Sequence, residues 1–232
     1  MAKYRKLRIV EQAIPKRELF KKRKFNVFVF GLPRSGTSMM TGIIELLGVK
    51  IISTSDTEEE LKKRNENERK RYGDKYHMNP KFFEITKNVW EHYLKIMGTP
   101  YSGCKMIIPV SKERMQVVNF NPGAKVIQMW RDPEEIRQSQ QASYKGNRGI
   151  TEEEAEFERA KIRTLLTNQK MQLEKLGIET IGVQYRDVLK DPETQIKRIA
   201  KFINAPKDIR DAVNWVDPKK NRFKKEEIIE NI

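Results

Sequence analysis

The stretch FNVFVFGLPRSGTSMMTGIIELLGV, residues 25–49, predicts the fold of the whole chain. It opens with aromatic and β-branched residues that end at Gly31, a pattern typical of a buried strand. Apolar residues then return at helical spacing, at positions 39, 40, 43, 44 and 47, and Gly48 follows where a helix would end. We therefore expect a strand, a glycine-bounded loop and a helix in direct succession.

The loop GLPRSGTS between strand and helix is suited to holding an anion. Gly31 and Gly36 let the backbone turn tightly, so that successive amides near a helix N-terminus point at one anion. A plain turn that binds nothing is the less favoured interpretation, because five consecutive potential anion donors serve no packing purpose. These donors are Arg34, Ser35, Gly36, Thr37 and Ser38.

The loop departs from the nucleotide-binding pattern GxxxxGK[ST] at one position. Thr37 stands where the lysine belongs, and the only loop cation is Arg34. A nucleoside triphosphatase needs that lysine on the terminal phosphates of its substrate. The sequence therefore favours a ligand group that carries less charge than a triphosphate.

Length and composition predict one soluble domain. The 232 residues suffice for a single α/β domain spanning 1–232. Cys104 is the only cysteine, which excludes an internal disulfide and a cysteine-rich zinc site and indicates a reducing compartment. We see neither an apolar run of membrane-spanning length nor a signal peptide, so we expect a cytoplasmic protein without membrane insertion.

Positive charge is concentrated at the start of the chain. The net charge is +15, and residues 1–24 hold ten Lys or Arg against two Glu, so this basic N-terminal arm carries +8. Such an arm suits contact with a polyanion or with an anionic membrane, although a solvated leader is the simpler interpretation. The remaining charge of +7 suits a site that attracts a polyanionic nucleotide.

Further strands and helices alternate along the chain. We expect strands over 49–52, 103–108, 125–130 and 178–185, and helices over 80–98, 132–144, 151–176 and 192–202, with a last helix at Trp215. The polar segment 56–71 is either an exposed helix or a mobile lid. This order predicts an α/β fold with a P-loop-like, mostly parallel sheet and helices on both faces. The ligand of such a sheet lies at the carboxyl ends of its strands, where the sequence places Arg34, Lys105 and Arg131.

Two expectations concern single elements. Lys105 interrupts an apolar strand, GCKMII, and either lies in a functional site or is solvated on an edge strand. The helix over 80–98 has an expected apolar face made of Phe82, Phe83, Val89, Trp90, Tyr93, Leu94 and Met97.

Four segments resemble the signature regions of one enzyme family. The segments GLPRSGTS, VIQMWRDPEEIRQSQ and VQYRDVLKDPETQIKRIAKFINAP resemble, in order and spacing, those of sulfotransferases that use 3′-phosphoadenosine 5′-phosphosulfate. YHMNPKFFE is similar to a segment of bacterial and phage-type members. The resemblance runs from about Asn26 to Pro206 and implies the same fold and the same sulfuryl donor.

The resemblance assigns binding roles to individual residues. It implies that the loop holds the 5′-phosphosulfate through Arg34, Ser35, Gly36, Thr37 and Ser38. It further implies that the 3′-phosphate is bound by Arg131 and Ser139 and the adenine ring by Tyr185, and Arg222 in the basic tail is a further candidate for the 3′-phosphate.

The implied reaction is in-line sulfuryl transfer to a hydroxyl or amine without a metal. Lys105 would reach the bridging oxygen. Cytosolic members carry a histidine base two residues later, where this chain has Ile107. The candidates for the general base are therefore Glu84 and Asp56, with His77 third, and for each a solvated surface role is an equal alternative.

Two other functions remain open from the sequence alone. A P-loop kinase with a variant loop would bind ATP with magnesium, but the missing lysine argues against it. A nucleic-acid-binding protein would use the basic ends of the chain, but the chain lacks a helix-turn-helix signature and an aromatic RNA-binding motif. We therefore expect no nucleic-acid partner. The sequence names neither the acceptor nor the oligomeric state.

Overall fold

A computed structural model describes residues 25–53, 89–107, 123–142 and 149–216, together with residues 59, 62, 63, 66, 115, 118, 119 and 121. The described residues of the segment 56–71 are helical. Several predictions fall outside the described residues: those for the arm 1–24, for the helix start at Pro80, and for Asp56, His77, Glu84 and Arg222.

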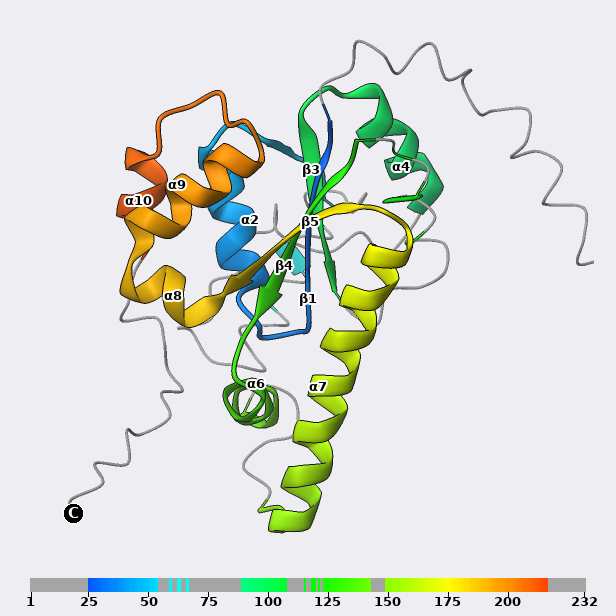
Figure 1. The fold of residues 1–232 in the computed structure, drawn as a ribbon, viewed down its shortest axis with the longest axis vertical. Helices are drawn as coiled ribbons and strands as arrows, with labels where there is room; N and C mark the ends of the chain where they lie inside the picture. Colours follow the sequence, from blue (N-terminus) through cyan, green and yellow to red (C-terminus); the bar gives the residue numbers. More distant parts are fainter. Residues whose placement is uncertain are drawn as a thin grey trace, which may run out of the picture.

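The described strands form one parallel sheet in the order β2-β3-β1-β4-β5 (Figure 1). The strands are β1 (Val27–Gly31), β2 (Lys50–Ile51), β3 (Ser102–Ile107), β4 (Lys125–Trp130) and β5 (Glu179–Gln184). All five residues of the central strand β1 are buried, which explains why its sequence is apolar throughout. The predicted parallel sheet is confirmed.

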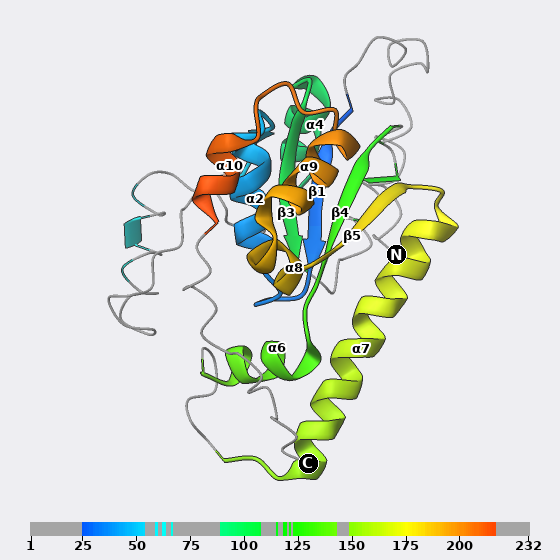
Figure 2. The same cartoon turned by 60° about the vertical axis from the view of Figure 1, so that its left-hand side comes forward.

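Helices cover both faces of the sheet, as predicted (Figure 2). One face packs on α2 (Thr37–Leu46), α8 (Tyr185–Lys190), α9 (Pro192–Phe202) and α10 (Arg210–Trp215). The other face packs on α4 (Val89–Gly98) and α7 (Glu152–Lys175). The short helix α6 (Pro133–Gln140) follows β4 and lies beside α7, beyond the carboxyl ends of the strands.

Helix caps follow the sequence closely. Thr151 accepts from the amide of Glu154, whose carboxylate accepts in return from the amide of Thr151, which makes the predicted capping box of α7. Asp132 caps α6 and Asp191 caps α9, and a proline follows each. Local sequence therefore determines where these helices begin.

The structure corrects two expectations and excludes one alternative. The strand predicted over 178–185 ends at Gln184, and Tyr185 begins the helix α8. Leu94 is 60 % exposed, because it lies opposite the buried His92 and Ile96 on α4. Lys105 is not on an edge strand, since β3 lies between β2 and β1 and only 5 % of Lys105 is exposed.

Candidate functional site

The loop between β1 and α2 has a shape that requires glycine. Gly36, the N-cap of α2, has a φ of 95°, which L side chains rarely adopt. A Cβ atom placed on Gly36 would lie 2.4 Å from Cδ2 of Tyr185, and one on Gly31 would lie 2.5 Å from Oγ of Ser35. Both glycines therefore allow close approach of neighbouring groups, and Gly36 also allows the turn itself.

The loop is closed by its own hydrogen bonds. The backbone nitrogen and the hydroxyl of Ser35 both donate to the carbonyl oxygen of Leu32, at 3.1 and 2.8 Å. Arg34 adopts a φ of 73°, a left-handed conformation that turns the chain just before the helix. Because α2 begins at Thr37, the amides of its first turn open toward the loop. The arrangement is suited to an anion.

Helix α6 holds the loop from the side. Nε of Arg34 donates to Oγ of the buried Ser139 at 2.9 Å, and Nη1 of Arg131 donates to the carbonyl oxygen of Arg34, also at 2.9 Å. Gln140 donates to the carbonyl oxygen of Pro33 at 3.0 Å. Two predicted site segments, about a hundred residues apart in the chain, thus meet at the carboxyl edge of the sheet.

Lys105 reaches the same place from β3. It pairs in register with Val29 of β1, which directs its side chain to the face covered by α2. There Nζ donates to Oγ of Ser38 in the first turn of α2, at 3.2 Å. The buried Lys105 thus contacts the first turn of α2, and its functional role stays a prediction.

Tyr185 packs between the loop and Arg131. Its ring meets Gly36, and the guanidinium carbon of Arg131 lies 4.4 Å from its ring centroid. Burial raises the pKa of the Tyr185 hydroxyl above its ordinary value. Tyr185 therefore packs against both the loop before α2 and the neighbouring arginine.

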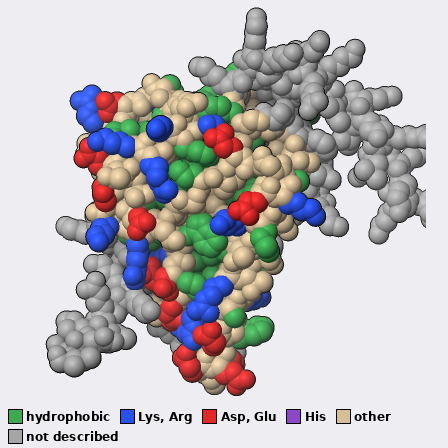
Figure 3. Space-filling model, in the orientation of Figure 1, with side chains coloured by type: hydrophobic (Ala, Val, Ile, Leu, Met, Phe, Trp, Pro, Cys, Tyr) green, Lys and Arg blue, Asp and Glu red, His purple; other side chains and the backbone are tan. Residues whose placement is uncertain are grey.

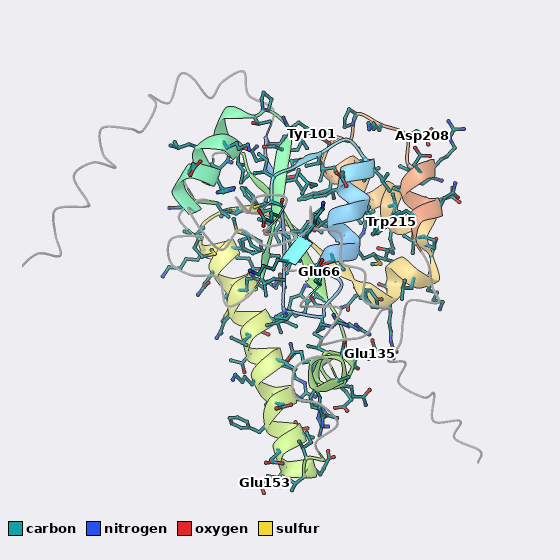
Figure 4. The ribbon with its side chains drawn as sticks, turned by 180° about the vertical axis from the view of Figure 1, so that it is seen from behind. Glu66, Tyr101, Glu135, Glu153, Asp208 and Trp215 are labelled. Carbon is teal, nitrogen blue, oxygen red and sulfur yellow. The ribbon has the colours of Figure 1, made fainter. Side chains whose placement is uncertain are left out.

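Glu135 and Arg186 complete the site, although sequence reasoning assigned them no role in it. Nε of Arg131 donates to Oε2 of Glu135, and Nε of Arg186 donates to Oε1, each at 2.8 Å. Figure 4 labels Glu135 where α6 meets the end of the sheet. The spacing of four residues between Arg131, just before the N-cap of α6, and Glu135, in the first turn of α6, was the available signal for an ion pair.

A second charged cluster fixes α6 against α7. Arg137 and Arg159 both donate to the carboxylate of Glu134, and these hydrogen bonds, that of Arg137 foremost, lower the pKa of Glu134 to about 2. Acidic side chains gather at the end of the molecule where α7 begins, which Figure 3 shows. The ion pairs of Glu134 with Arg137 and Arg159 hold α6, the helix that carries Ser139, against α7.

The described residues show two further absences. No helix in the described part of the chain has the length and apolarity to cross a membrane. Likewise, the described ranges contain no group of three His, Cys, Asp or Glu residues that could hold a metal ion.

A family model and several solved structures match this chain. The family model described as "Sulfotransferase family" matches residues 26–208. Mouse sulfotransferase SULT7A1 complexed with PAP is 15% identical, with a TM-score of 0.50 over 86% of this chain and 67% of that chain.

Two further solved structures are similar with lower scores. Sulfotransferase STF1 from Mycobacterium tuberculosis H37Rv is 12% identical over 83% of this chain and 71% of that chain, with a TM-score of 0.48. A retinol dehydratase in complex with androsterone and inactive cofactor PAP is 16% identical over 92% of this chain and 71% of that chain, with a TM-score of 0.43. A search of curated proteins finds no match.

Proposed function

Because this chain belongs to the sulfotransferase family, we propose that it transfers a sulfuryl group from 3′-phosphoadenosine 5′-phosphosulfate to a hydroxyl or amine acceptor. One observation carries the proposal: Arg34, Lys105 and Arg131 come from three separate segments and converge around the start of α2. Cations around a helix N-terminus suit a nucleotide with phosphate groups at two positions.

Each group of the donor has a proposed set of partners. The 5′-phosphosulfate binds the loop from Arg34 to Ser38, chiefly through its amides and the Arg34 guanidinium. The 3′-phosphate binds Arg131, which directly precedes the N-cap of α6, and Ser139, which lies in the last turn of α6. Tyr185 contacts the adenine ring.

The chemistry is an in-line displacement at sulfur. The acceptor oxygen or nitrogen forms a bond to sulfur while the bond from sulfur to the 5′-phosphate oxygen breaks, and the acceptor proton passes to a general base. Lys105 stabilises the charge that develops on the bridging oxygen, and Arg34 with the loop amides stabilises the leaving phosphate. The proposed mechanism uses no metal, because a sulfuryl group carries less charge than a phosphoryl group.

Glu84 and Asp56 are the proposed bases, with His77 third. If Glu84 is the base, the variant Glu84→Gln slows transfer and leaves nucleotide affinity intact. If that variant turns over like wild type, the general base is instead Asp56 or His77. The variants Asp56→Asn and His77→Ala then distinguish between these two residues.

The remaining proposals concern the protein as a whole. We place the chain in the cytoplasm as one sulfotransferase domain over 1–232, with residues 1–24 as a basic arm and Arg222 as an additional contact for the 3′-phosphate. Its partner is an acceptor substrate that offers a hydroxyl or an amine. The single cysteine, Cys104, supports a reducing compartment.

Calorimetry with 3′-phosphoadenosine 5′-phosphate, in EDTA, tests the proposed donor site. We expect binding without a metal, and a failure to bind at high micromolar concentration refutes the proposal. Magnesium-dependent binding of ATP in its place would favour the kinase alternative. Binding of nucleic acid with a steep salt dependence would favour the third alternative.

A further inference from the structure

Glu135 is a buried acid beside a proposed phosphate-binding arginine. It is 1 % exposed, and each of its carboxylate oxygens accepts a hydrogen bond from a different arginine, Arg131 or Arg186. A carboxylate at this place repels an incoming phosphate and is costly to bury. Its presence therefore needs a reason other than attraction of the ligand.

The contacts of Arg131 give that reason. Its Nε is held by Glu135, its Nη1 by the carbonyl oxygen of Arg34, and its planar group lies over the ring of Tyr185. These three contacts restrict rotation of the guanidinium about the side-chain axis. A guanidinium recognises phosphate well only when its planar fork already faces the oxygens.

Arg186 holds Glu135 from the other side. Its Nε and Nη2 both contact Oε1, at 2.8 and 2.6 Å, and its side chain is 51 % exposed. Arg186 directly follows Tyr185 at the start of α8, so this contact also fastens α8 to α6. The second arginine neutralises the carboxylate, which lowers the repulsion that a bound phosphate would feel.

We propose that Glu135, held by Arg186, is a positioning residue that orients Arg131 for the 3′-phosphate and thereby makes the site select 3′-phosphorylated nucleotides. This inference rests on the proposed function. In this proposal the carboxylate fixes the orientation of Arg131 and does not itself contact the nucleotide.

The test compares two nucleotides that differ only in the 3′-phosphate. Calorimetry measures the affinity of adenosine 3′,5′-bisphosphate and of adenosine 5′-monophosphate for wild type and for Arg186→Gln. We expect the variant to lose about tenfold in affinity for the bisphosphate, the scale of one weakened charge-assisted hydrogen bond, and to keep its affinity for the monophosphate within about twofold. Arg163→Gln is the matched control, because Arg163 is 57 % exposed and pairs with Glu156 on α7.

Two more variants separate position from charge. Arg186→Lys keeps the charge but loses the fork on Glu135, so positioning predicts a loss like that of Arg186→Gln. Wild-type selectivity in Arg186→Lys overturns the inference. Glu135→Gln removes a negative charge, so a purely electrostatic role predicts tighter binding of the bisphosphate and positioning predicts weaker binding.

The outcomes distinguish this inference from the proposed function. Wild type that does not bind the bisphosphate refutes the proposed donor site and the inference with it. Wild type that binds it, with every variant showing wild-type selectivity, refutes the inference alone. A thermal melt of each variant checks its folding, and the half-exposed Arg186 carries the test if Glu135→Gln does not fold.

Discussion

Replacing Gly36 with alanine tests the packing on which the whole site depends. The residue has a φ of 95°, and forcing an L residue into the left-handed region costs about 1–2 kcal/mol. The new Cβ would also lie 2.4 Å from the Tyr185 ring, which must then shift. Overpacking of this kind costs about 1–3 kcal/mol, so the free energy of unfolding should fall by about 2–5 kcal/mol in total.

A double-mutant cycle separates the two costs. In a Tyr185→Ala background the steric cost disappears, so Gly36→Ala should then cost only the backbone strain of about 1–2 kcal/mol. The coupling energy between the two positions, measured by urea unfolding, should therefore be about 1–3 kcal/mol. Because Arg131 lies 4.4 Å above the same ring, Gly36→Ala should also weaken binding of adenosine 3′,5′-bisphosphate.

The control for this cycle is Gly98→Ala. Gly98 ends α4 and lacks a positive φ, and a Cβ atom added to it would have no neighbour within 4 Å, so alanine should leave stability unchanged or raise it by about 0.5–1 kcal/mol. A coupling energy below about 0.5 kcal/mol between Gly36 and Tyr185 would refute the reasoning, since additive effects mean that the two residues do not press on each other.

Four further predictions follow from single side chains. Lys105→Met should lower turnover by about a hundredfold with little change in Tm, because an unbranched apolar side chain fills the same buried space. Arg34→Ala should reduce activity far more than stability, and equal losses of both would contradict its role. Thr151→Ala should cost about 1 kcal/mol in urea unfolding through loss of the cap. The lowered pKa of Glu134, about 2, means that its ion pairs stabilise the fold above the ordinary carboxyl pKa near 4.5 and less as the pH falls toward 2. Glu134→Gln should thus lower the free energy of unfolding by about 1–2 kcal/mol at pH 7, after allowance for solvent screening. Near pH 2 the variant and the wild type should be equally stable.

Elements that depend on local sequence could be predicted. The strand, loop and helix around Gly36, the capping box at Thr151 and the helix start after Asp132 all use groups within a few residues of one another. The edge of the sheet at which the candidate site lies could also be predicted, because parallel strands place their carboxyl ends at one edge. The sequence therefore predicted that Arg34 and Arg131 lie at the same edge of the sheet, but not the distances between their atoms.

Contacts between distant segments could not be predicted. Arg186 meets Glu135 only because β5 lies beside β4 and α8 turns back at Tyr185, and nothing near either residue signals that contact. The exposed Leu94 shows a similar limit, since an apolar residue alone does not reveal which side of a helix faces the core.

The missing loop lysine and the two arginines of the site lead to one physical conclusion. A lysine within the loop would concentrate positive charge at one point, where a terminal phosphate with its magnesium sits. Here the charge is divided: Arg34 extends from the loop to Ser139, and Arg131 extends from the end of β4 back to the loop. Divided charge matches a ligand with two separate anionic groups better than one with a triphosphate. The buried Glu135 strengthens this argument, because a site that needed only maximal attraction would have no carboxylate beside its arginine.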